Sequence, residues 1–246
     1  MIDHHEPRWA LGFDIGGTFT DYVLLHRDDG HMHIFKHLTT PDDPARGALE
    51  GMRIFLRQRD LGFEDVSLAI HGTTLVTNTL IERRGAVTGL LTTEGFRDIL
   101  EMGKEQRYDI YDLFLKFPAP LVRRRFRREV RERVDRSGRI IVPLDEEHVL
   151  RETQFLVDEG IQSLAITFLH AYAYPDHERR AADVVRAHFP NLPIATSADV
   201  APEIREYERT VTTTANAFVK PQADAYIARL EHELRDAGMQ GQFLLM

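Results

Sequence analysis

Residues 14–21, with the sequence D-I-G-G-T-F-T-D, combine the residue types that can bind a phosphate group. Apolar runs lead into and out of this stretch, which predicts a strand, a tight glycine turn and a second strand. Gly16 and Gly17 carry no Cβ and tolerate positive φ, so a bulky anion could approach their main chain. Successive amides in such a turn form an anion-binding nest, and Thr18 and Thr20 add hydroxyl donors. The stretch therefore predicts a phosphate-binding hairpin.

Asp14, directly before the turn, could hold a metal-bound water or orient an attacking group. The alternative is an ordinary Gly-Gly hairpin, but that structure requires neither two threonines nor flanking aspartates. A dinucleotide fingerprint needs a helix after the turn, and a Walker A loop needs a lysine; both are excluded. The order D-x-G-G-T and then a strand resembles the phosphate hairpin of the actin, Hsp70 and sugar-kinase ATPases.

A second stretch with possible chemistry is H-G-T-T-L-V-T-N, residues 71–78. It follows a predicted buried strand at residues 66–71 and opens a predicted helix. Helix N-termini attract anions through unpaired amides and the dipole, so Thr73, Thr74 and Asn78 could face nucleotide phosphates or the substrate. The alternative is N-capping by threonine, a common structural task. The presence of the phosphate hairpin in the same chain favours the functional interpretation.

The composition sets broad limits on the class of protein. A chain of 246 residues can bury one large core or two modest ones. Its net charge of −8 argues against a general nucleic-acid binder but not against a local basic site. Cysteine is absent, which excludes a disulfide framework and thiolate metal sites. No apolar run is long enough to span a membrane, and residues 1–7 show no signal-peptide core. We therefore expect a cytoplasmic protein that binds neither nucleic acid nor membrane.

The remaining pattern alternates strands with helices, which implies parallel strands joined by right-handed crossovers. Strands are expected at 9–13, 22–25, 31–36, 66–71, 86–91, 163–168 and 193–196. Helices are expected from 41–44 onward, at 75–82, 145–159 and 176–188, and in a long last segment. Pro221 should end or kink that last helix.

Three charged or irregular segments allow more than one interpretation. The arginine-rich run at residues 123–128 could hold phosphate or an acidic partner, but nearby acidic residues favour a surface strand, and residues 130–134 alternate like a half-exposed strand. Residues 102–120 are irregular and could either line a substrate pocket or pack on the core. A further group fits no compact metal-ligand spacing, so we expect capping and surface roles for it. Its members are His170, Asp176, His177 and Glu178.

Six segments together resemble the N-terminal region of the hydantoinase/oxoprolinase family. They are F-D-I-G-G-T-F-T-D (13–21), H-G-T-T-x-x-T-N (71–78), E-R-V (132–134), F-L-H-A-Y-x-x-P-x-H-E (168–178), P-E-I-R-E-Y-E-R (202–209) and N-A-F-V-K-P (216–221). The family includes ATP-hydrolysing N-methylhydantoinase, 5-oxoprolinase and the acetone and acetophenone carboxylases.

This resemblance implies an α/β fold of the actin, Hsp70 and sugar-kinase type, with a ribonuclease-H-like mixed sheet and helices. It implies that ATP phosphorylates an amide or ketone oxygen, with Mg²⁺ bridging the phosphates. The favoured activity is ATP-dependent hydrolysis of a cyclic amide. A subunit of an ATP-dependent ketone carboxylase and a non-catalytic nucleotide-binding module remain as alternatives.

The resemblance also implies roles for individual residues. Phosphate ligands would be Gly16, Gly17, Thr18 and Thr20. Groups near the reacting atoms would be Asp14, Thr73, Thr74 and Asn78. Asp14 would in addition hold Mg²⁺ or its water, while Glu206 and Arg209 are weaker candidates near the cleft.

Members of this family are much longer than this chain. We therefore expect residues 1–241 to form the N-terminal domain and residues 242–246 to begin a second ATPase domain. The second phosphate loop and the adenine-binding segments would lie in that domain. A C-terminal domain or a partner subunit of the hydantoinase B type would complete the site for a small cyclic amide.

Overall fold

The computed structural model of the chain describes residues 8–40, 43–105, 109 and 111–246, so the start at residues 1–7 lies outside it. The chain folds as two compact units. The first contains the residues up to Asn78 and residues 223–246, and the second contains residues 79–222. The chain thus passes between units within α2 (Leu75–Glu82) and within α7 (Glu206–Asp236). The boundary expected between residues 241 and 242 does not coincide with this division.

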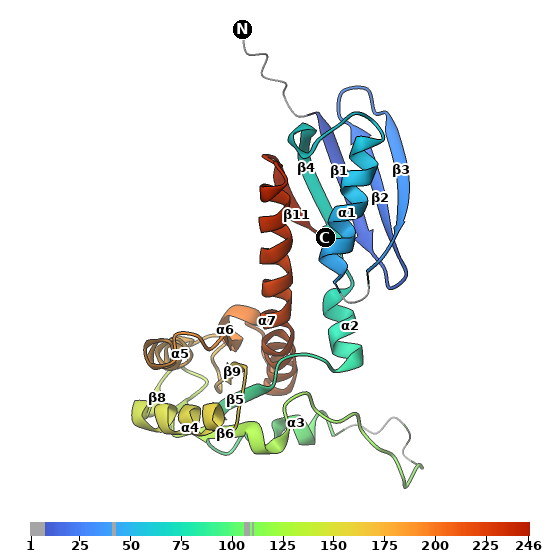
Figure 1. The fold of residues 1–246 in the computed structure, drawn as a ribbon. Coiled ribbons are helices and arrows are strands. Elements are labelled where there is room, and N and C mark those ends of the chain that lie inside the picture. Colours follow the sequence, from blue (N-terminus) through green and yellow to red (C-terminus); the bar gives the residue numbers. More distant parts are fainter. Residues whose placement is uncertain (1–7, 41–42, 106–108, 110) are drawn as a thin grey trace. The chain divides into compact units, whose positions relative to one another are not determined.

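The first unit is built on a five-stranded mixed sheet in the order β11-β4-β1-β2-β3 (Figure 1). Its strands are β1 (Trp9–Ile15), β2 (Phe19–His26), β3 (Met32–Leu38), β4 (Val66–Gly72) and β11 (Gln242–Leu245). The first three strands pair antiparallel, whereas β4 runs parallel to both β1 and β11. This is the ribonuclease-H-like mixed α/β sheet that the resemblance implied, and residues 242–245 are one of its strands.

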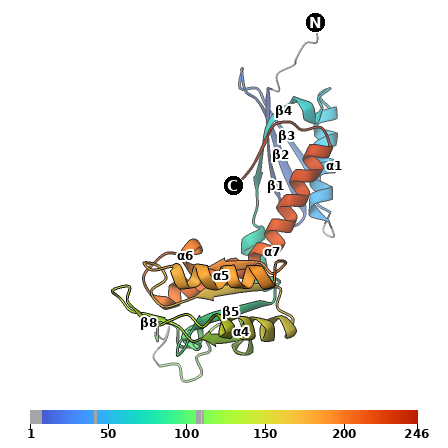
Figure 2. The ribbon, with the colours of Figure 1, turned by 90° about the vertical axis from the view of Figure 1, so that its left-hand side faces the viewer.

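One face of this sheet forms the core of the first unit. Alternation along β2 turns Tyr22 and Leu24 into the core, while Val23 faces outward. The helix α1 (Pro44–Arg57) is capped by the Asp43 carboxylate, which accepts from the Arg46 amide at 3.2 Å. The apolar stripe of α1 and the C-terminal part of α7 cover the same face (Figure 2). A short 3₁₀ helix, Phe63–Asp65, leads into β4.

The second unit contains a parallel sheet in the order β10-β9-β5-β6. Its strands are β5 (Thr88–Thr93), β6 (Arg127–Val130), β9 (Ser163–Thr167) and β10 (Ile194–Thr196). All of β5 and β9 is buried, as expected for parallel strands covered on both faces. The remaining elements are α3 (Ile99–Met102), a 3₁₀ helix (Arg124–Phe126), the hairpin of β7 (Arg133–Val134) and β8 (Ile140–Val142), α4 (Glu146–Asp158), α5 (Asp176–His188) and α6 (Ser197–Val200). The predicted start of α4 is confirmed, because the Asp145 carboxylate accepts from the His148 amide at 2.8 Å.

The long helix α7 does not end at Pro221, which lies inside it. Of the two outcomes expected at Pro221, an end or a kink, the structure excludes the end. A proline removes one backbone donor, and the packing of buried side chains on both sides, such as Phe218 and Leu230, keeps the helix intact. Within the described residues, no helix is both long and apolar enough to cross a membrane.

The arginine-rich run is not a surface strand throughout. Arg127 is fully buried, and its guanidinium donates to the Val122 carbonyl at 2.8 and 3.0 Å and to the Glu101 carboxylate at 3.0 Å. Burial alternates along residues 130–134 as expected, but the strand is interrupted between β6 and β7. Glu132 is buried because the Thr93 hydroxyl and His177 Nδ1 both bond its carboxylate.

The expected surface roles of His177 and Glu178 were also wrong. Both are buried at the start of α5, and His177 Nδ1 lies 2.7 Å from the Glu132 carboxylate. The Glu178 carboxylate accepts from the amides of Phe168 at 2.6 Å and Ala198 at 2.9 Å, and from the Ser197 hydroxyl at 2.5 Å. These charged groups are buried because their hydrogen bonds connect segments of the second unit that lie far apart in the sequence. Residue spacing does not reveal such connections.

Candidate functional site

The two stretches that drew attention in the sequence meet at one end of the first sheet. β1 and β4 are parallel, so their carboxyl ends lie at the same edge, and Asp14 pairs with Gly72 in the register. The parallel strand β11 ends there too, where the Met246 amide donates to the His71 carbonyl at 2.9 Å. The hairpin of residues 14–21 and the β4–α2 junction are therefore neighbours.

The turn of the hairpin is held by its own backbone and by Thr39. The Gly16 amide donates to the Phe19 carbonyl at 3.0 Å. The Thr39 hydroxyl donates to the Gly16 carbonyl at 2.8 Å, and the Thr39 amide donates to the Thr18 carbonyl at 2.9 Å. Thr20 is fully buried, with its hydroxyl 3.0 Å from that of Thr39. Thr20 thus supports the turn from inside, and Thr39 is a contributor that no sequence signal indicated.

The two glycines of the turn have different roles. Neither Gly16 nor Gly17 adopts positive φ, so conformational freedom does not explain them. A Cβ on Gly16 would lie 2.8 Å from the Phe19 carbonyl oxygen, which requires glycine on steric grounds. A Cβ on Gly17 would meet nothing within 4 Å. The missing side chain of Gly17 therefore leaves exposed main chain open from outside.

The acidic group beside this turn is free to bind a ligand. Asp14 is exposed, and within the described residues its carboxylate has no hydrogen bond or ion pair. Mg²⁺ is usually bound through one or two carboxylates together with substrate phosphates, so a single free aspartate beside an open glycine suits that ion. In the part of the chain that the structure describes, no group of three or more histidine or acidic side chains is placed to hold a metal.

The two threonines at the β4–α2 junction bond groups at the start of the helix, but only Thr73 accepts from a backbone amide. The Thr73 hydroxyl accepts from the Leu75 amide at 3.1 Å, and the Thr74 hydroxyl accepts from the Asn78 side-chain amide at 3.2 Å. Each hydroxyl still has its own proton to donate. Capping and binding an anion at this helix N-terminus are therefore compatible.

His71 lies behind the junction and is fully buried. Its ring stacks on Phe13 with centroids 4.4 Å apart. Nδ1 lies 3.3 Å from the Phe13 carbonyl, which can only accept, so Nδ1 carries the proton and Nε2 accepts from the Tyr226 hydroxyl at 2.8 Å. Burial lowers the pKa of His71 and raises the pKa of Tyr226 to about 12, so both groups are neutral. The initial letter of H-G-T-T was the only sequence signal for this support, and nothing pointed to Tyr226.

The two weaker candidates, Glu206 and Arg209, belong to the second unit. Arg209 is buried, and its guanidinium donates to the Phe168 carbonyl at 2.8 Å and to the Glu203 carbonyl at 3.2 Å. These bonds give Arg209 a structural task at the carboxyl ends of the second sheet.

The chain belongs to the family described as the hydantoinase/oxoprolinase N-terminal region, which matches residues 10–189. An uncharacterised protein of Methanocaldococcus jannaschii is 36% identical over 97% of this chain and 35% of its own length. The caprolactamase subunit alpha of Pseudomonas jessenii is 34% identical over 96% of this chain and 34% of its length. This chain thus spans about a third of the length of these relatives.

Two solved structures share this fold. The ATP-dependent caprolactamase of Pseudomonas jessenii superposes with a TM-score of 0.87 at 33% identity, covering 96% of this chain and 35% of that one. A nucleotide-free acetone carboxylase superposes with a TM-score of 0.84 at 26% identity, covering 96% of this chain and 36% of that one. Relatives of this chain are therefore ATP-dependent enzymes, and the fold extends over nearly all of its residues.

Proposed function

We propose that this chain forms one side of the ATP site in an ATP-dependent hydrolase of cyclic amides. The carrying observation is the open carboxyl end of the first sheet. There the exposed and unpaired carboxylate of Asp14 lies beside a turn whose Gly17 main chain is open. Such an end, where parallel strands stop, is where open α/β sheets bind their ligands.

In this proposal the residues at the sheet end divide into ligands and supports. The exposed main chain of Gly17 and the hydroxyl of Thr18 contact the phosphates. Thr73, Thr74 and Asn78 present donors from the N-terminus of α2, where the helix dipole favours an anion. Gly16 and Thr20 hold the turn in shape through the contacts described above.

Asp14 would hold Mg²⁺ directly or through water, and the metal would offset the negative charge of the phosphates. ATP would supply a phosphoryl group to the amide oxygen, which would make the amide carbon a better electrophile for water before the ring C–N bond breaks. The neutral His71–Tyr226 pair places no positive charge behind Asp14, so the pair does not compete with a cation for this side chain.

The cyclic-amide class is supported by the caprolactamase, which is related in both sequence and structure. A role as a ketone carboxylase subunit is the second candidate, supported by the acetone carboxylase structure. Because relatives extend over about three times this length, we propose that further polypeptide, from a C-terminal domain or a partner subunit, completes the site.

The deciding experiment measures ADP release by the complete protein, with any partner subunit, in the presence of Mg²⁺. Caprolactam, 5-oxoproline, hydantoin and acetone with bicarbonate are compared in parallel. Faster ADP release with a lactam or hydantoin, together with ring opening, supports the hydrolase. Stimulation by acetone alone would favour the carboxylase, and no stimulation by any of the four would overturn both.

A separate measurement tests the nucleotide site itself. Calorimetric titration of the complete protein with ADP and Mg²⁺ should show saturable binding that Thr18→Val weakens. Thr39→Val serves as a comparison for indirect effects, because Thr39 supports the turn without facing its open side. Equal binding by wild type and Thr18→Val would exclude the hydroxyl as a phosphate ligand.

A further inference from the structure

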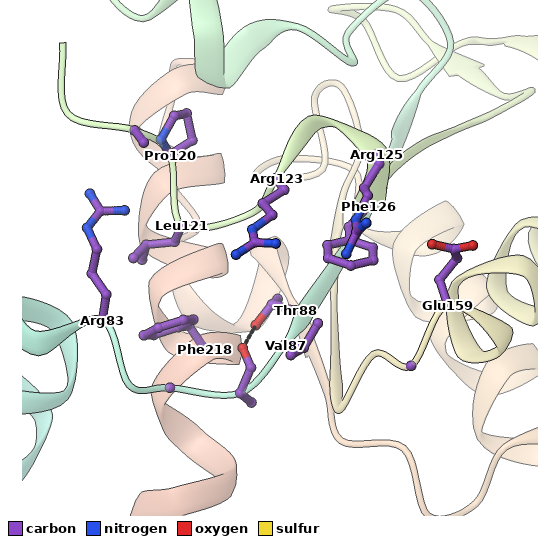
Figure 3. A pocket seen from close by; sticks show the side chains of 14 residues that line it. Arg83, Val87, Thr88, Pro120, Leu121, Arg123, Arg125, Phe126, Glu159 and Phe218 are labelled. Atoms are coloured by element: carbon purple, nitrogen blue, oxygen red, sulfur yellow. Dashed lines mark hydrogen bonds between the residues drawn. The ribbon is translucent and has the colours of Figure 1, made fainter. Parts of the chain in front are cut away.

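The second unit contains a cavity of about 470 Å³ that the proposed ATP site does not involve. This volume lies within the range of small-molecule sites. The cavity is formed by the segment 83–88, the segment 119–126, the end of α4 with Gly160, and Phe218 of α7 (Figure 3). All of these residues belong to the second unit, so the cavity is complete within it.

The floor of the cavity is apolar and rigid. Phe126 and Phe218 are largely buried beneath it, while Val87 remains 40% exposed at its surface. The chain approaches closely here, since a Cβ on Gly85 would lie 2.3 Å from the Phe218 ring. The Ala86 amide donates to the Phe218 carbonyl at 2.8 Å, which fixes the first segment against α7. Such a floor suits the apolar part of a small molecule.

Three arginines surround this floor: Arg83, Arg123 and Arg125. In the view of Figure 3, Arg123 is seen between the other two. All three are exposed, and none has a carboxylate partner among the described residues. The guanidinium of Arg125 lies 4.5 Å from the centre of the Phe126 ring, which holds it at the cavity.

The unpaired arginines differ from the other members of the same run. Arg124 is bound to the Asp98 carboxylate at 2.8 and 3.0 Å, and Arg128 is paired with Glu152. Arg127 is buried against Glu101 and the Val122 carbonyl. Three of the five arginines at residues 123–128 therefore have partners within the fold. The remaining two, Arg123 and Arg125, line the cavity. There they meet Arg83, which comes from a segment 40 residues earlier.

The charge at the cavity is opposite to that of the whole chain. Its only acidic lining residue is Glu159 on the far wall, so three arginines leave a formal excess of two positive charges. The complete sequence has a net charge of −8. A local positive region with an apolar floor attracts a compact anion, and guanidinium groups match the geometry of carboxylate and phosphate.

We propose that this cavity binds a small organic anion that combines two negative charges with an apolar body. A phosphate monoester and a dicarboxylate share this chemistry. Arg123, Arg125 and Arg83 bind the charged end, and the surface of Val87, Leu121 and Phe126 accepts the apolar end. Glu159 disfavours extended polyanions, because an additional negative group would meet its carboxylate.

The test uses phenyl phosphate and phthalate as the two anionic probes and benzyl alcohol as a neutral probe. Modification of individual arginines of the complete protein by phenylglyoxal is followed by mass spectrometry. Either anion should slow modification of Arg83, Arg123 and Arg125 but not of Arg136, an exposed arginine in the β7–β8 turn. Measuring each arginine separately distinguishes this cavity from the proposed phosphate site, because none of the residues proposed to bind phosphate is an arginine.

Calorimetry with the same probes gives the size of the effect. Arg123→Gln combined with Arg125→Gln should weaken binding by about tenfold or more, because two charge-assisted contacts are lost. Arg136→Gln, which changes the net charge outside the cavity, should alter it by less than about twofold. Melting temperatures of both variants close to that of wild type would show that the fold is retained.

Protection by phenyl phosphate alone assigns the cavity to phosphate esters, and protection by phthalate alone assigns it to dicarboxylates. The proposal is overturned if neither anion protects the three arginines more than Arg136. It is also overturned if benzyl alcohol protects equally well, or if the double variant binds the anions like wild type.

Discussion

Parallel strands end side by side in both sheets, but the polar groups at the two carboxyl ends differ in burial. In the first unit β1, β4 and β11 end together, and Asp14 is exposed there, with its carboxylate unpaired among the described residues. In the second unit β5 and β9 also end side by side. Their end is filled by buried polar groups from other parts of the unit, among them Glu132, His177, Glu178 and Arg209.

The difference separates binding from structural polar residues. A buried carboxylate needs donors, and Glu178 has three within 2.9 Å, so its bonding capacity is used by the fold. Asp14 retains its full capacity for an external ligand. Charged residues in sequence motifs therefore fall into two groups: buried ones whose hydrogen bonds are made within the fold, and exposed ones that can still bind a ligand. The motifs alone do not show which group a residue belongs to.

The largest expected effect is the loss of activity in Asp14→Ala of the complete enzyme. We expect ADP release to fall by about a thousandfold or more, because the proposed metal ligand is removed. The free energy of unfolding should change by less than about 0.5 kcal/mol, since the side chain is exposed and unpaired. Steady-state kinetics and urea unfolding measure the two quantities.

The matched control is Asp21→Ala, which removes the carboxylate opposite Asp14 in the hairpin. Asp21 is paired with Lys36 at 3.0 Å on the exposed face, so its loss should cost no more than about 1 kcal/mol and little activity. Normal turnover in Asp14→Ala would show that the open sheet end is structural only.

The opposite result is expected for Glu178→Ala in the second unit. Removing the carboxylate leaves three buried donors without an acceptor, which should lower the free energy of unfolding by about 3–4 kcal/mol. Asp176→Ala, an exposed position in the first turn of the same helix, should cost less than about 1 kcal/mol. Similar losses in the two variants would contradict a structural role for Glu178.

The two sheet ends should also respond in opposite directions to pH. Burial raises the pKa of Glu178 to about 7 from its ordinary value of 4.5. As the pH rises, the unfolded chain loses this proton before the folded chain does. The contribution of Glu178 to stability therefore declines between about pH 4.5 and about pH 7, and the decline is no more than about 3 kcal/mol. Burial lowers the pKa of His71, so its contribution declines as the pH falls through about 6.5.

Urea unfolding of wild type and Glu178→Gln between pH 5 and 8 measures the first of these effects. The difference in stability between the two proteins should change with pH in that interval, because the glutamine does not titrate. A constant difference across the interval would show that Glu178 has the same pKa in the folded and unfolded chain.

The smallest expected effects distinguish the two glycines of the hairpin turn. Gly16→Ala should cost about 1–2 kcal/mol, because its Cβ would press on the Phe19 carbonyl oxygen. Gly17→Ala should leave stability within about 0.5 kcal/mol of wild type, since its Cβ meets nothing within 4 Å. It should nevertheless weaken ADP binding in calorimetry. Unchanged binding would remove the main chain of Gly17 from the proposed phosphate site.

Much of the fold was predictable from local patterns. Alternating burial along β2, the capping carboxylates Asp43 and Asp145, and the short apolar centre of β9 at residues 164–166 each follow from short-range rules. The strand–turn–strand of the β1–β2 hairpin was predictable for the same reason. The continuation of α7 through Pro221 was not, because distant packing outweighs the loss of one local hydrogen bond.

The sequence by itself determined the family, the hairpin from Asp14 to Asp21 and the residue types available to bind phosphate. Only the tertiary structure decided which polar groups remain free. Thr20 is turned inward onto Thr39, Glu178 is enclosed by donors, and Arg123 beside the cavity has no carboxylate partner among the described residues. The physical reason is that burial and hydrogen-bond satisfaction depend on segments far apart in the chain, whereas composition and spacing describe each segment alone.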